Sequence, residues 1–301
     1  MRCFCFKILL FVVLCVLMDS LFGLAGKYLV SHAISGETMK NAYICDHTSE
    51  DILIFGSSRA VHHYDPIILQ DSLGLSCYNC AYDGCGSITA YGLLKILIQH
   101  YTPKVIIYDV APGYDYLKSD KDNTKYLGPL KVYYDREGID SIFVKSDSKE
   151  GYKMRSKMYR LNSQLIQMLS ENIVKRNETV NGYLPENKKM QYEPEINEEV
   201  RNEYDTLKMN CLGRFVVECK QRGIKLVFYA SPSYKKTNDG EFSYIKALSK
   251  KEGIPFVNHY TDSSFIYNKD YFFDSVHMNQ SGATKYTQYI VSELRNFIRG
   301  N

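Results

Sequence analysis

The sequence predicts a parallel, doubly wound α/β domain behind an N-terminal apolar segment. Three segments, Ile52–Phe55, Val105–Asp109 and Lys225–Tyr229, are largely continuous apolar runs rather than alternating ones. Such runs are typical of strands buried on both faces, as in a parallel sheet. Segments with helical periodicity separate them, which is the element order of a doubly wound fold. The chain has 301 residues, 45% of them hydrophobic, enough for one large core or a core with a smaller lobe.

The first 30 residues predict a membrane anchor or a signal peptide. Arg2 and Lys7 precede the wholly apolar run Ile8–Met18, and apolar residues resume after Asp19. This order keeps the N-terminus cytoplasmic and sends the rest of the chain across the membrane. We favour an uncleaved single-pass anchor with the body of the protein outside the cytoplasm. The alternative is a secreted protein cleaved at the small residues of Gly23–Ala25.

Two weaker strands complete the expected sheet, Ser76–Asn79 and Pro255–Val257. A short helix should begin at Asp65-Pro66, since proline is favoured in a first helical turn. Longer helices, with apolar residues at intervals of three and four, are expected at Ser87–Tyr101 (capped by Ser87), Glu199–Gly223 and Asn279–Ile298 (capped by Asn279).

An insertion at about 113–197 interrupts the alternation of strands and helices and is rich in Lys, Tyr, Asn, Asp and Glu. It carries one expected helix, Ser156–Ile173. An insertion of this length between strands is more typical of a cap over a site than of a plain loop. We therefore expect one α/β domain over residues 31–301, with this helical insertion over the carboxyl edge of its sheet.

The charge balance and the cysteines exclude some classes of function. A formal net charge of +3 gives no reason to expect a nucleic-acid partner. An even number of cysteines outside the targeting segment permits disulfides in an exported chain, but their pairing cannot be read from sequence. We interpret them as buried free thiols, because the C-x-x-C motif lacks a second metal-binding pair. They are Cys45, Cys77, Cys80, Cys85, Cys211 and Cys219.

The first strand runs directly into Gly56-Ser57-Ser58-Arg59. In parallel α/β sheets, ligands bind beyond the carboxyl ends of the strands. A serine at this point is therefore either a cap for the next helix or a nucleophile. A serine hydroxyl is a poor nucleophile at neutral pH and needs a base within hydrogen-bond reach. Ser57 is expected to hydrogen-bond its own turn, which leaves Ser58 as the candidate nucleophile.

His277 has the sequence setting of the missing base. Asp274 precedes it by three residues, just before the helix that Asn279 is expected to cap. In a short turn this carboxylate can reach Nδ1, fix the tautomer and leave Nε2 free to face a serine. D-x-x-H spacing also arises by chance, so the prediction depends on its combination with the strand-end Ser58.

These segments resemble the SGNH, or GDSL-like, superfamily of esterases and acyltransferases. The first block of that superfamily is a strand followed by Gly-Asp-Ser, and it matches Gly56-Ser57-Ser58 with Ser57 in place of the aspartate. The last block is D-x-x-H and matches Asp274 and His277. The resemblance implies that Ser58, His277 and Asp274 form a catalytic triad.

The oxyanion-binding blocks match less closely. "YNCAYDGCGS" resembles the second block through Asn79 and Gly84. The third block normally supplies an asparagine that donates to the oxyanion, whereas this chain has "YDVAPGYD", with Asp109 in that neighbourhood. The resemblance then implies an oxyanion hole made of the backbone N–H groups of Ser58 and Gly84. It also makes Arg59, Asn79 and Asp109 candidates for substrate binding.

The resemblance covers about residues 50–110 and 225–298 and implies a flavodoxin-like three-layer α/β/α fold. "GSSR", the anchor and the long insertion are similar to an envelope branch that includes alginate O-acetyltransferases and the D-alanyl transfer protein of teichoic acid synthesis. That branch implies a membrane-anchored, extracytoplasmic serine esterase or O-acyltransferase. Its substrates would be small acyl esters, such as acetyl, on envelope polysaccharides, handled through an acyl-serine without a metal or organic cofactor.

Two other functions stay open. In the first, the chain would be a catalytically weak or inactive scaffold or glycan-binding protein of the envelope. The missing third-block asparagine favours this function. Alternatively, it is a partner subunit that receives an acyl group from a membrane-bound acyltransferase, which still requires Ser58.

Residues around the expected site have simpler interpretations. We expect His62 and His63 to be exposed or to cap their helix rather than to face the cleft. Two roles are equally expected for Asp109: orienting substrate or Arg59, or accepting backbone N–H bonds as a buried carboxylate. Ser231 is expected in a turn before a proline.

Overall fold

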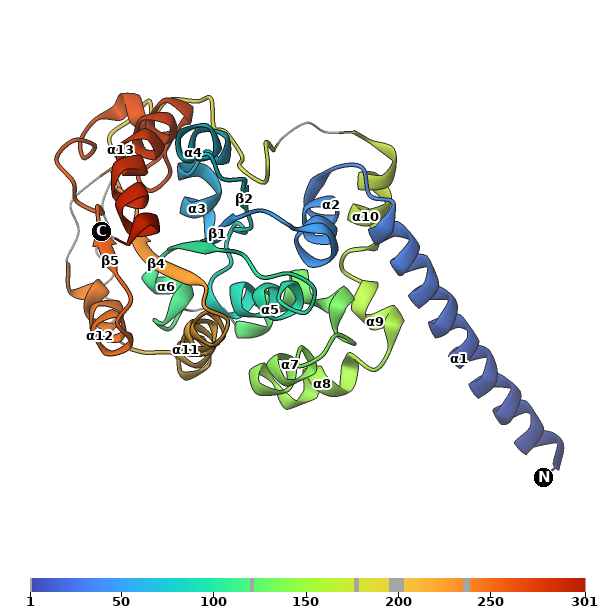
Figure 1. The fold of residues 1–301 in the computed structure, drawn as a ribbon. Coiled ribbons are helices and arrows are strands. Elements are labelled where there is room, and N and C mark those ends of the chain that lie inside the picture. The colour runs from blue at the N-terminus through green and yellow to red at the C-terminus, as the bar shows by residue number, and fades with distance from the viewer. Residues whose placement is uncertain (1, 120–121, 176–178, 195–202, 235–238, 301) are drawn as a thin grey trace. The chain divides into compact units, whose positions relative to one another are not determined.

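The computed structural model describes residues 2–119, 122–175, 179–194, 203–234 and 239–300 (Figure 1). The chain divides into two compact units. The sheet unit consists of Asp46–Asp122 and Glu178–Asn301, and the helical unit of Met1–Cys45 and Asn123–Asn177. The N-terminal segment and most of the expected insertion therefore belong to one unit, which differs from the single domain over residues 31–301 that the sequence predicts.

Within the described residues, the sheet unit contains five parallel strands in the order β2-β1-β3-β4-β5. This is the order of a flavodoxin-like doubly wound sheet, and the predicted α/β fold class is confirmed. Each predicted strand is present, with ends that differ by no more than one residue. The strands are β1 Ile52–Gly56, β2 Cys77–Asn79, β3 Val105–Asp109, β4 Lys225–Ala230 and β5 Phe256–Asn258.

The register of the central strands brings the candidate site to one edge of the sheet. Gly56 at the end of β1 pairs with Asp109 at the end of β3. Asp109 in turn pairs with Tyr229 of β4. Because the strands are parallel, the residues that follow each of them meet at the same carboxyl edge. Ser57 and Ser58 therefore lie at the edge where ligands of such sheets bind.

Helices cover both faces of this sheet (Figure 1). One face packs against α3 (Ser58–His63), α4 (Pro66–Leu73) and α13 (Gln280–Arg299), which contribute side chains to one buried apolar cluster with β1, β3 and β4. On the other face, Phe215 of α11 (Thr206–Gln221) packs edge-on against Phe55 and Tyr108. Helix α5 (Ser87–Leu97) packs against α11.

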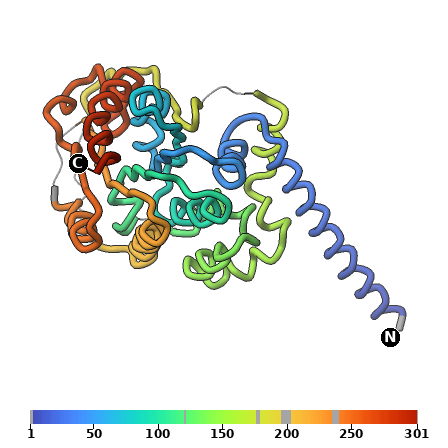
Figure 2. Tube along the Cα trace, viewed as in Figure 1, coloured from blue at the N-terminus to red at the C-terminus, as the bar shows by residue number. Residues whose placement is uncertain are grey.

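The C-terminal helix α13 lies beside α3 and α4, although it is far from them in sequence (Figure 2). The hydroxyl of Thr287 donates to the carbonyl of His63, 224 residues away. Asn279 caps α13 by accepting the N–H of Gly282, as predicted. This packing carries the loop that precedes α13 to the end of β1.

Other helix boundaries depart from the sequence analysis. Ser87 does not cap α5, because its hydroxyl donates to the carbonyl of Lys208 and Gly86 takes the cap position. Helix α11 begins after Asp205, whose carboxylate accepts two backbone N–H groups. Residues 199–202 of the predicted helix lie outside the described residues. The predicted helix at Asp65-Pro66 is α4, with Asp65 as its cap.

The helical unit begins with α1, Arg2–Ser31. Cys3–Ser31 is long and apolar enough to cross a membrane, which is compatible with a signal anchor or a signal peptide. The predicted helix Ser156–Ile173 is broken after Leu161 into two, of which Ser156 caps the first. The other elements are α2 Gly36–Ala42, 3-10 helix η2 Asn123–Tyr133, α7 Asp140–Ser146, α8 Ser148–Lys153, α9 Lys157–Leu161 and α10 Leu165–Ile173.

The remaining short elements are π-helix η1 Tyr43–His47, α6 Pro112–Asp115, 3-10 helix η3 Asp239–Phe242, α12 Ser243–Glu252 and 3-10 helix η4 Lys269–Tyr271. All nine cysteines are free thiols. Five of the six outside α1 are buried and Cys85 is half-buried, close to the predicted set of buried thiols.

Candidate active site

Ser58, His277 and Asp274 form a continuous hydrogen-bonded chain in the sheet unit. The Ser58 hydroxyl lies 2.7 Å from Nε2 of His277. On the other side of the ring, Nδ1 lies 2.8 Å from Oδ2 of Asp274. All three residues are half-buried. The two segments that the sequence analysis paired across 219 residues are thus in direct contact.

The turn from β1 into α3 places Ser58 in this position. Gly56 has φ 145°, and a Cβ there would lie 2.6 Å from the Asp109 carbonyl oxygen, so the turn requires glycine. Ser57 precedes the helix and its carbonyl accepts the N–H of Val61, but its side chain makes no capping hydrogen bond. Ser58 is the first residue of α3, which directs its hydroxyl to the sheet edge.

The loop before α13 holds the base through Asp274. One oxygen of this carboxylate accepts the backbone N–H groups of Val276 and His277, and the other faces the imidazole. Burial raises the pKa of Asp274, but these donors and the ring outweigh it, so its pKa is lowered from the ordinary carboxyl value. Asp274 is therefore ionised at neutral pH. An ionised acceptor keeps the proton of neutral His277 on Nδ1 and leaves Nε2 as the acceptor for Ser58.

His62 is buried beside the base, contrary to the expectation that it is exposed or capping. Its ring meets that of His277 edge to face, with centroids 5.5 Å apart. Nδ1 lies 2.8 Å from the Leu184 carbonyl and Nε2 lies 3.3 Å from the Asp83 carboxylate. Burial lowers the pKa of His62, but Asp83 and the Leu184 carbonyl outweigh it and the pKa is raised. With an acceptor at each nitrogen, the ring is suited to carry a positive charge.

His63 is fully buried, which also contradicts the expectation. Its Nε2 accepts the backbone N–H of Met278, at 2.9 Å. That contact fixes the proton on Nδ1, which donates to the Ser231 hydroxyl at 2.9 Å. Burial and the nearby positive charge of Arg59 hold the pKa of His63 well below its usual value. His63 is therefore a neutral link between α3 and the loop that carries His277.

Arg59 and Asp109 are buried in the interior. The guanidinium donates to the carbonyls of Val110 and Ser231, and its Nε lies 3.6 Å from the Asp109 carboxylate. Asp109 also accepts the N–H and hydroxyl of Ser231 and the hydroxyl of Tyr64. Of the two roles considered for Asp109, the buried acceptor is the one found, together with the contact to Arg59.

Asn79, the third substrate-binding candidate, is also fully buried. Its amide donates to the Ala60 carbonyl at 2.7 Å, and its oxygen accepts the N–H of Ala81. The first of these bonds connects β2 with α3. The predicted contacts of Arg59, Asn79 and Asp109 with substrate are therefore not supported, because their polar atoms bind protein groups away from solvent.

The structure says less about the predicted oxyanion donors than about the contacts of Ser58 with His277. Gly84 is half-buried, has φ 62°, and follows Asp83, which contacts His62. It thus belongs to the loop that borders the site, and its role as a donor stays a prediction. The segment after β3, where an asparagine is usual in the resembled superfamily, places Val110 and Ala111 at the strand end. Neither side chain can donate a hydrogen bond.

Four residues that border the site were not assigned to it from sequence: His62, His63, Asp83 and Ser231. His62, His63 and Ser231 have partners between 122 and 215 residues away in the chain. Asp83 contacts His62, 21 residues away. One signal was available, because Ser58 and His62 are four residues apart on a helix, a spacing that puts them on one face. Arg59 and His63 share the neighbouring, inward face by the same rule.

Comparisons with known proteins find structural similarity only. No family model matches the chain. No curated protein matches it either. A solved structure of a candidate acylhydrolase from Bacteroides fragilis is 12% identical, covers 86% of this chain and 93% of its own, and has a TM-score of 0.42.

Two further structures are similar at the same level. A candidate lipolytic protein of the G-D-S-L family from Desulfitobacterium hafniense is 8% identical, with 80% of this chain and 98% of that chain covered and a TM-score of 0.39. A candidate platelet activating factor from Streptococcus pneumoniae is 12% identical, with 90% and 96% covered and a TM-score of 0.39. Likenesses this distant say nothing about the activity of this chain.

Proposed function

We propose that the sheet unit is a serine esterase or O-acyltransferase. The observation that carries this proposal is the hydrogen-bonded chain from Ser58 through His277 to Asp274, with contacts of 2.7 and 2.8 Å. A structural role for the three residues explains this order less well, because capping a helix requires no imidazole at the serine hydroxyl. Ser58 is half-buried and lies at the carboxyl edge of a parallel sheet, which is where substrates of such folds bind.

In the proposed reaction, the Ser58 oxygen attacks the carbonyl carbon of an ester and His277 Nε2 takes the hydroxyl proton. Asp274 stabilises the resulting imidazolium and keeps the ring oriented. The tetrahedral intermediate collapses, His277 returns the proton to the departing alcohol, and the acyl group stays on Ser58. Water or a second alcohol then accepts the acyl group by the same steps in reverse order, which gives hydrolysis or transfer.

The backbone N–H groups of Ser58 and Gly84 are the proposed oxyanion donors. Ser58 begins α3 and Gly84 lies in the turn after β2, and the developing negative charge would lie at this carboxyl edge. Loss of one oxyanion donor typically costs about 10²- to 10³-fold in rate. An oxyanion hole without a side-chain donor at the β3 end therefore predicts a modest turnover.

We propose that α1 is retained as a single-pass anchor and that the enzyme acts outside the cytoplasm. Asp19 of α1 accepts hydrogen bonds from the Ser156 hydroxyl and the Met158 N–H, so α1 is bound to α9. Gly23 and Ala25, at the possible cleavage site, lie within the helix rather than in an extended segment. This location, with the sequence resemblance, supports acyl esters of envelope polysaccharides as substrates. A membrane-bound acyltransferase is a proposed donor partner.

The proposal is tested by labelling the purified full-length chain with a fluorophosphonate, which reacts with activated serines. Labelling is expected at Ser58 and should be lost in Ser58→Ala and His277→Ala. Ser57→Ala, a change to the adjacent serine with no side-chain cap, is the matched control and should still be labelled. A folded wild-type protein that resists labelling would instead indicate the scaffold or glycan-binding function.

A second measurement distinguishes esterase from transferase. Hydrolysis of aryl acetates that depends on Ser58 favours an esterase. Acyl transfer to an oligosaccharide without comparable hydrolysis favours a transferase. An acyl-Ser58 that forms only in the presence of a membrane-bound acyltransferase would identify the chain as the acceptor subunit of that enzyme.

A further inference from the structure

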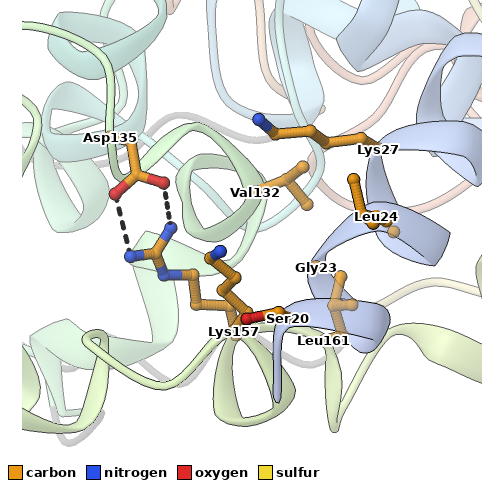
Figure 3. Close-up of a pocket in the computed structure, with 10 residues that line it drawn as sticks. Ser20, Gly23, Leu24, Lys27, Val132, Asp135, Lys157 and Leu161 are labelled. Carbon is orange, nitrogen blue, oxygen red and sulfur yellow. Dashed lines mark hydrogen bonds and ion pairs between the residues drawn. The ribbon is translucent and has the colours of Figure 1, made fainter. Parts of the chain in front are cut away.

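A small pocket with a cavity volume of about 60 Å³ lies in the helical unit, between α1, η2 and α9 (Figure 3). Its apolar wall includes Leu24, Val132 and Leu161, and its polar wall includes Lys27 and Lys157. It is separate from the Ser58 site, which belongs to the sheet unit. Nothing in the proposed acyl chemistry uses it.

The pocket is formed by close packing of α9 against α1. A Cβ on Gly23 would lie 2.3 Å from Cδ of Lys157, and one on Gly26 would lie 2.6 Å from a methyl group of Leu161. The absence of side chains at these two positions lets α9 approach α1. Asp19, one turn earlier, accepts the N–H of Met158 and so fixes the start of α9.

Two lysines give the pocket an excess of positive charge. Arg160 is paired with Asp135 through two hydrogen bonds of 2.5 and 2.9 Å, so this ion pair contributes little net charge. The side chains of Lys27 and Lys157 turn toward the side where Asp135 lies (Figure 3). Within the described part of the chain, neither lysine ammonium forms an ion pair with a carboxylate. The carboxylates of Asp19 and Asp135 act on these lysines electrostatically without a direct ion pair. Three basic and two acidic side chains therefore leave one net positive charge for a bound anion.

The position of the pocket along α1 places it at the extracytoplasmic surface of the bilayer that α1 is proposed to cross. The side chains from Cys3 to Met18 are all exposed, which is about 24 Å of helix at about 1.5 Å per residue. A bilayer core of about 30 Å takes about 20 residues. With Arg2 on the cytoplasmic side, the core ends near Asp19, whose carboxylate binds the start of α9. Gly23, against which Lys157 packs, lies one turn beyond it, among the lipid headgroups.

We infer that this pocket binds the phosphate of an anionic lipid headgroup in the outer leaflet. The two lysines would hold the phosphodiester, and Leu24 and Leu161 would contact the start of the acyl chains. An apolar wall next to cations at headgroup depth fits a lipid better than a soluble anion. The apolar side chains can contact the acyl chains of a lipid, whereas a soluble anion has no apolar part for them to contact. The inference rests on the proposed retention of α1 and is independent of the chemistry at Ser58.

The experiment uses the full-length chain in neutral detergent, with phosphatidylglycerol as the probe and phosphatidylcholine as the reference lipid. Retention of each lipid is measured by native mass spectrometry. Each basic residue near a membrane surface is worth about fivefold in affinity for anionic lipid, so Lys27→Gln with Lys157→Gln should bind phosphatidylglycerol about 25-fold less tightly. Phosphatidylcholine binding should not change.

The matched control is Lys145→Gln with Lys149→Gln, which removes the same charge from exposed positions of the same unit. This control should bind phosphatidylglycerol like the wild type, and all variants should be labelled equally at Ser58. Equal losses in both double variants, or equal retention of the two lipids, would overturn the inference. So would displacement of phosphatidylglycerol by millimolar inorganic phosphate, which assigns the pocket to a soluble anion.

The same mass spectra test whether α1 is retained, which is the premise of this inference. An intact mass that includes residues 1–25 shows that α1 is retained. A mature chain that begins after Ala25 lacks Leu24 and Gly23, and therefore lacks one wall of the pocket, which overturns the inference whatever the activity at Ser58.

Discussion

The backbone N–H of Met278 donates a 2.9 Å hydrogen bond to Nε2 of His63. This bond joins the helix that begins with Ser58 to the loop that carries His277. The distance between the hydroxyl and the proposed base is therefore set by two contacts, the direct one and the one through His63. Beyond His63, the Ser231 hydroxyl donates to the buried Asp109, which ties both elements to the ends of β3 and β4.

His63→Ala should lower kcat while KM changes little. Without the imidazole, the Met278 N–H loses its acceptor and the loop of His277 can shift. A displacement of about 1 Å at a catalytic group can cost about 10²-fold in rate. The measurement is steady-state hydrolysis of an aryl acetate, with kcat and KM determined separately. His63→Gln, whose amide oxygen can accept the same N–H, is the control and should recover most of the rate; equal damage in both variants would contradict the positioning role.

Asp274→Asn should reduce kcat by about 10³- to 10⁴-fold while the fold is kept. The asparagine oxygen can still accept the N–H groups of Val276 and His277, but it no longer provides a charge for the imidazolium. The pKa of Asp274 is lowered, so Asp274 is ionised above the ordinary carboxyl range and its effect is lost only as pH falls below that range. The measurement is a pH–rate profile of both proteins. The variant should be less active than the wild type at neutral pH as well as in acid.

The fold was predictable because its signals are local. The runs at β1, β3 and β4 are largely continuous apolar segments, which is typical of a sheet covered on both faces. The contacts among Ser58, His277 and Asp274 were predictable in part for the same reason, since D-x-x-H is a short-range pattern and Ser58 follows the first strand by two residues. Their assembly across 219 residues depended on the resemblance to a known superfamily.

The parts that sequence reasoning missed depend on tertiary partners. His62 and His63 are polar and adjacent, which in isolation favours an exposed turn. They are buried because Asp83, Leu184, Ser231 and Met278 supply an acceptor or donor for every ring nitrogen. The association of the N-terminal segment with residues 123–177 was missed likewise, because it depends on contacts such as that of Asp19 with Ser156.

The stability of Asp115→Asn, compared with that of the wild type at the same pH, should increase from acid to alkaline pH. Asp115 is fully buried and accepts the Tyr108 hydroxyl and the Ala111 N–H. Burial dominates and raises the pKa of Asp115 to about 7, so the folded state holds its proton between about pH 4 and 7 while the unfolded state releases it. Wild-type stability therefore falls as pH rises through this window, and the asparagine variant escapes that loss.

The size of this effect follows from linkage. Between pH 5 and pH 8, the variant should gain about 2–3 kcal/mol in free energy of unfolding relative to the wild type. Urea denaturation of both proteins at the two pH values measures it. Asp71→Asn, at an exposed position of α4, is the control and should show no such difference. A gain that is the same at both pH values would indicate a packing effect rather than titration.

Asp83→Asn should lower the pKa of His62. Burial alone lowers the pKa of this ring, and the Asp83 carboxylate supplies the largest opposing contribution, so its removal lets burial dominate. Because the folded pKa of His62 is raised, the ion pair stabilises the protein below the unfolded value of about 6.5, and this stabilisation is lost as pH rises through the folded pKa. Asp83 is 47% exposed, so the stabilisation should be below about 1 kcal/mol. NMR titration of the His62 ring is therefore the sharper measurement, and a pKa that does not move in Asp83→Asn would show that the Leu184 carbonyl, not the carboxylate, holds the proton on the ring.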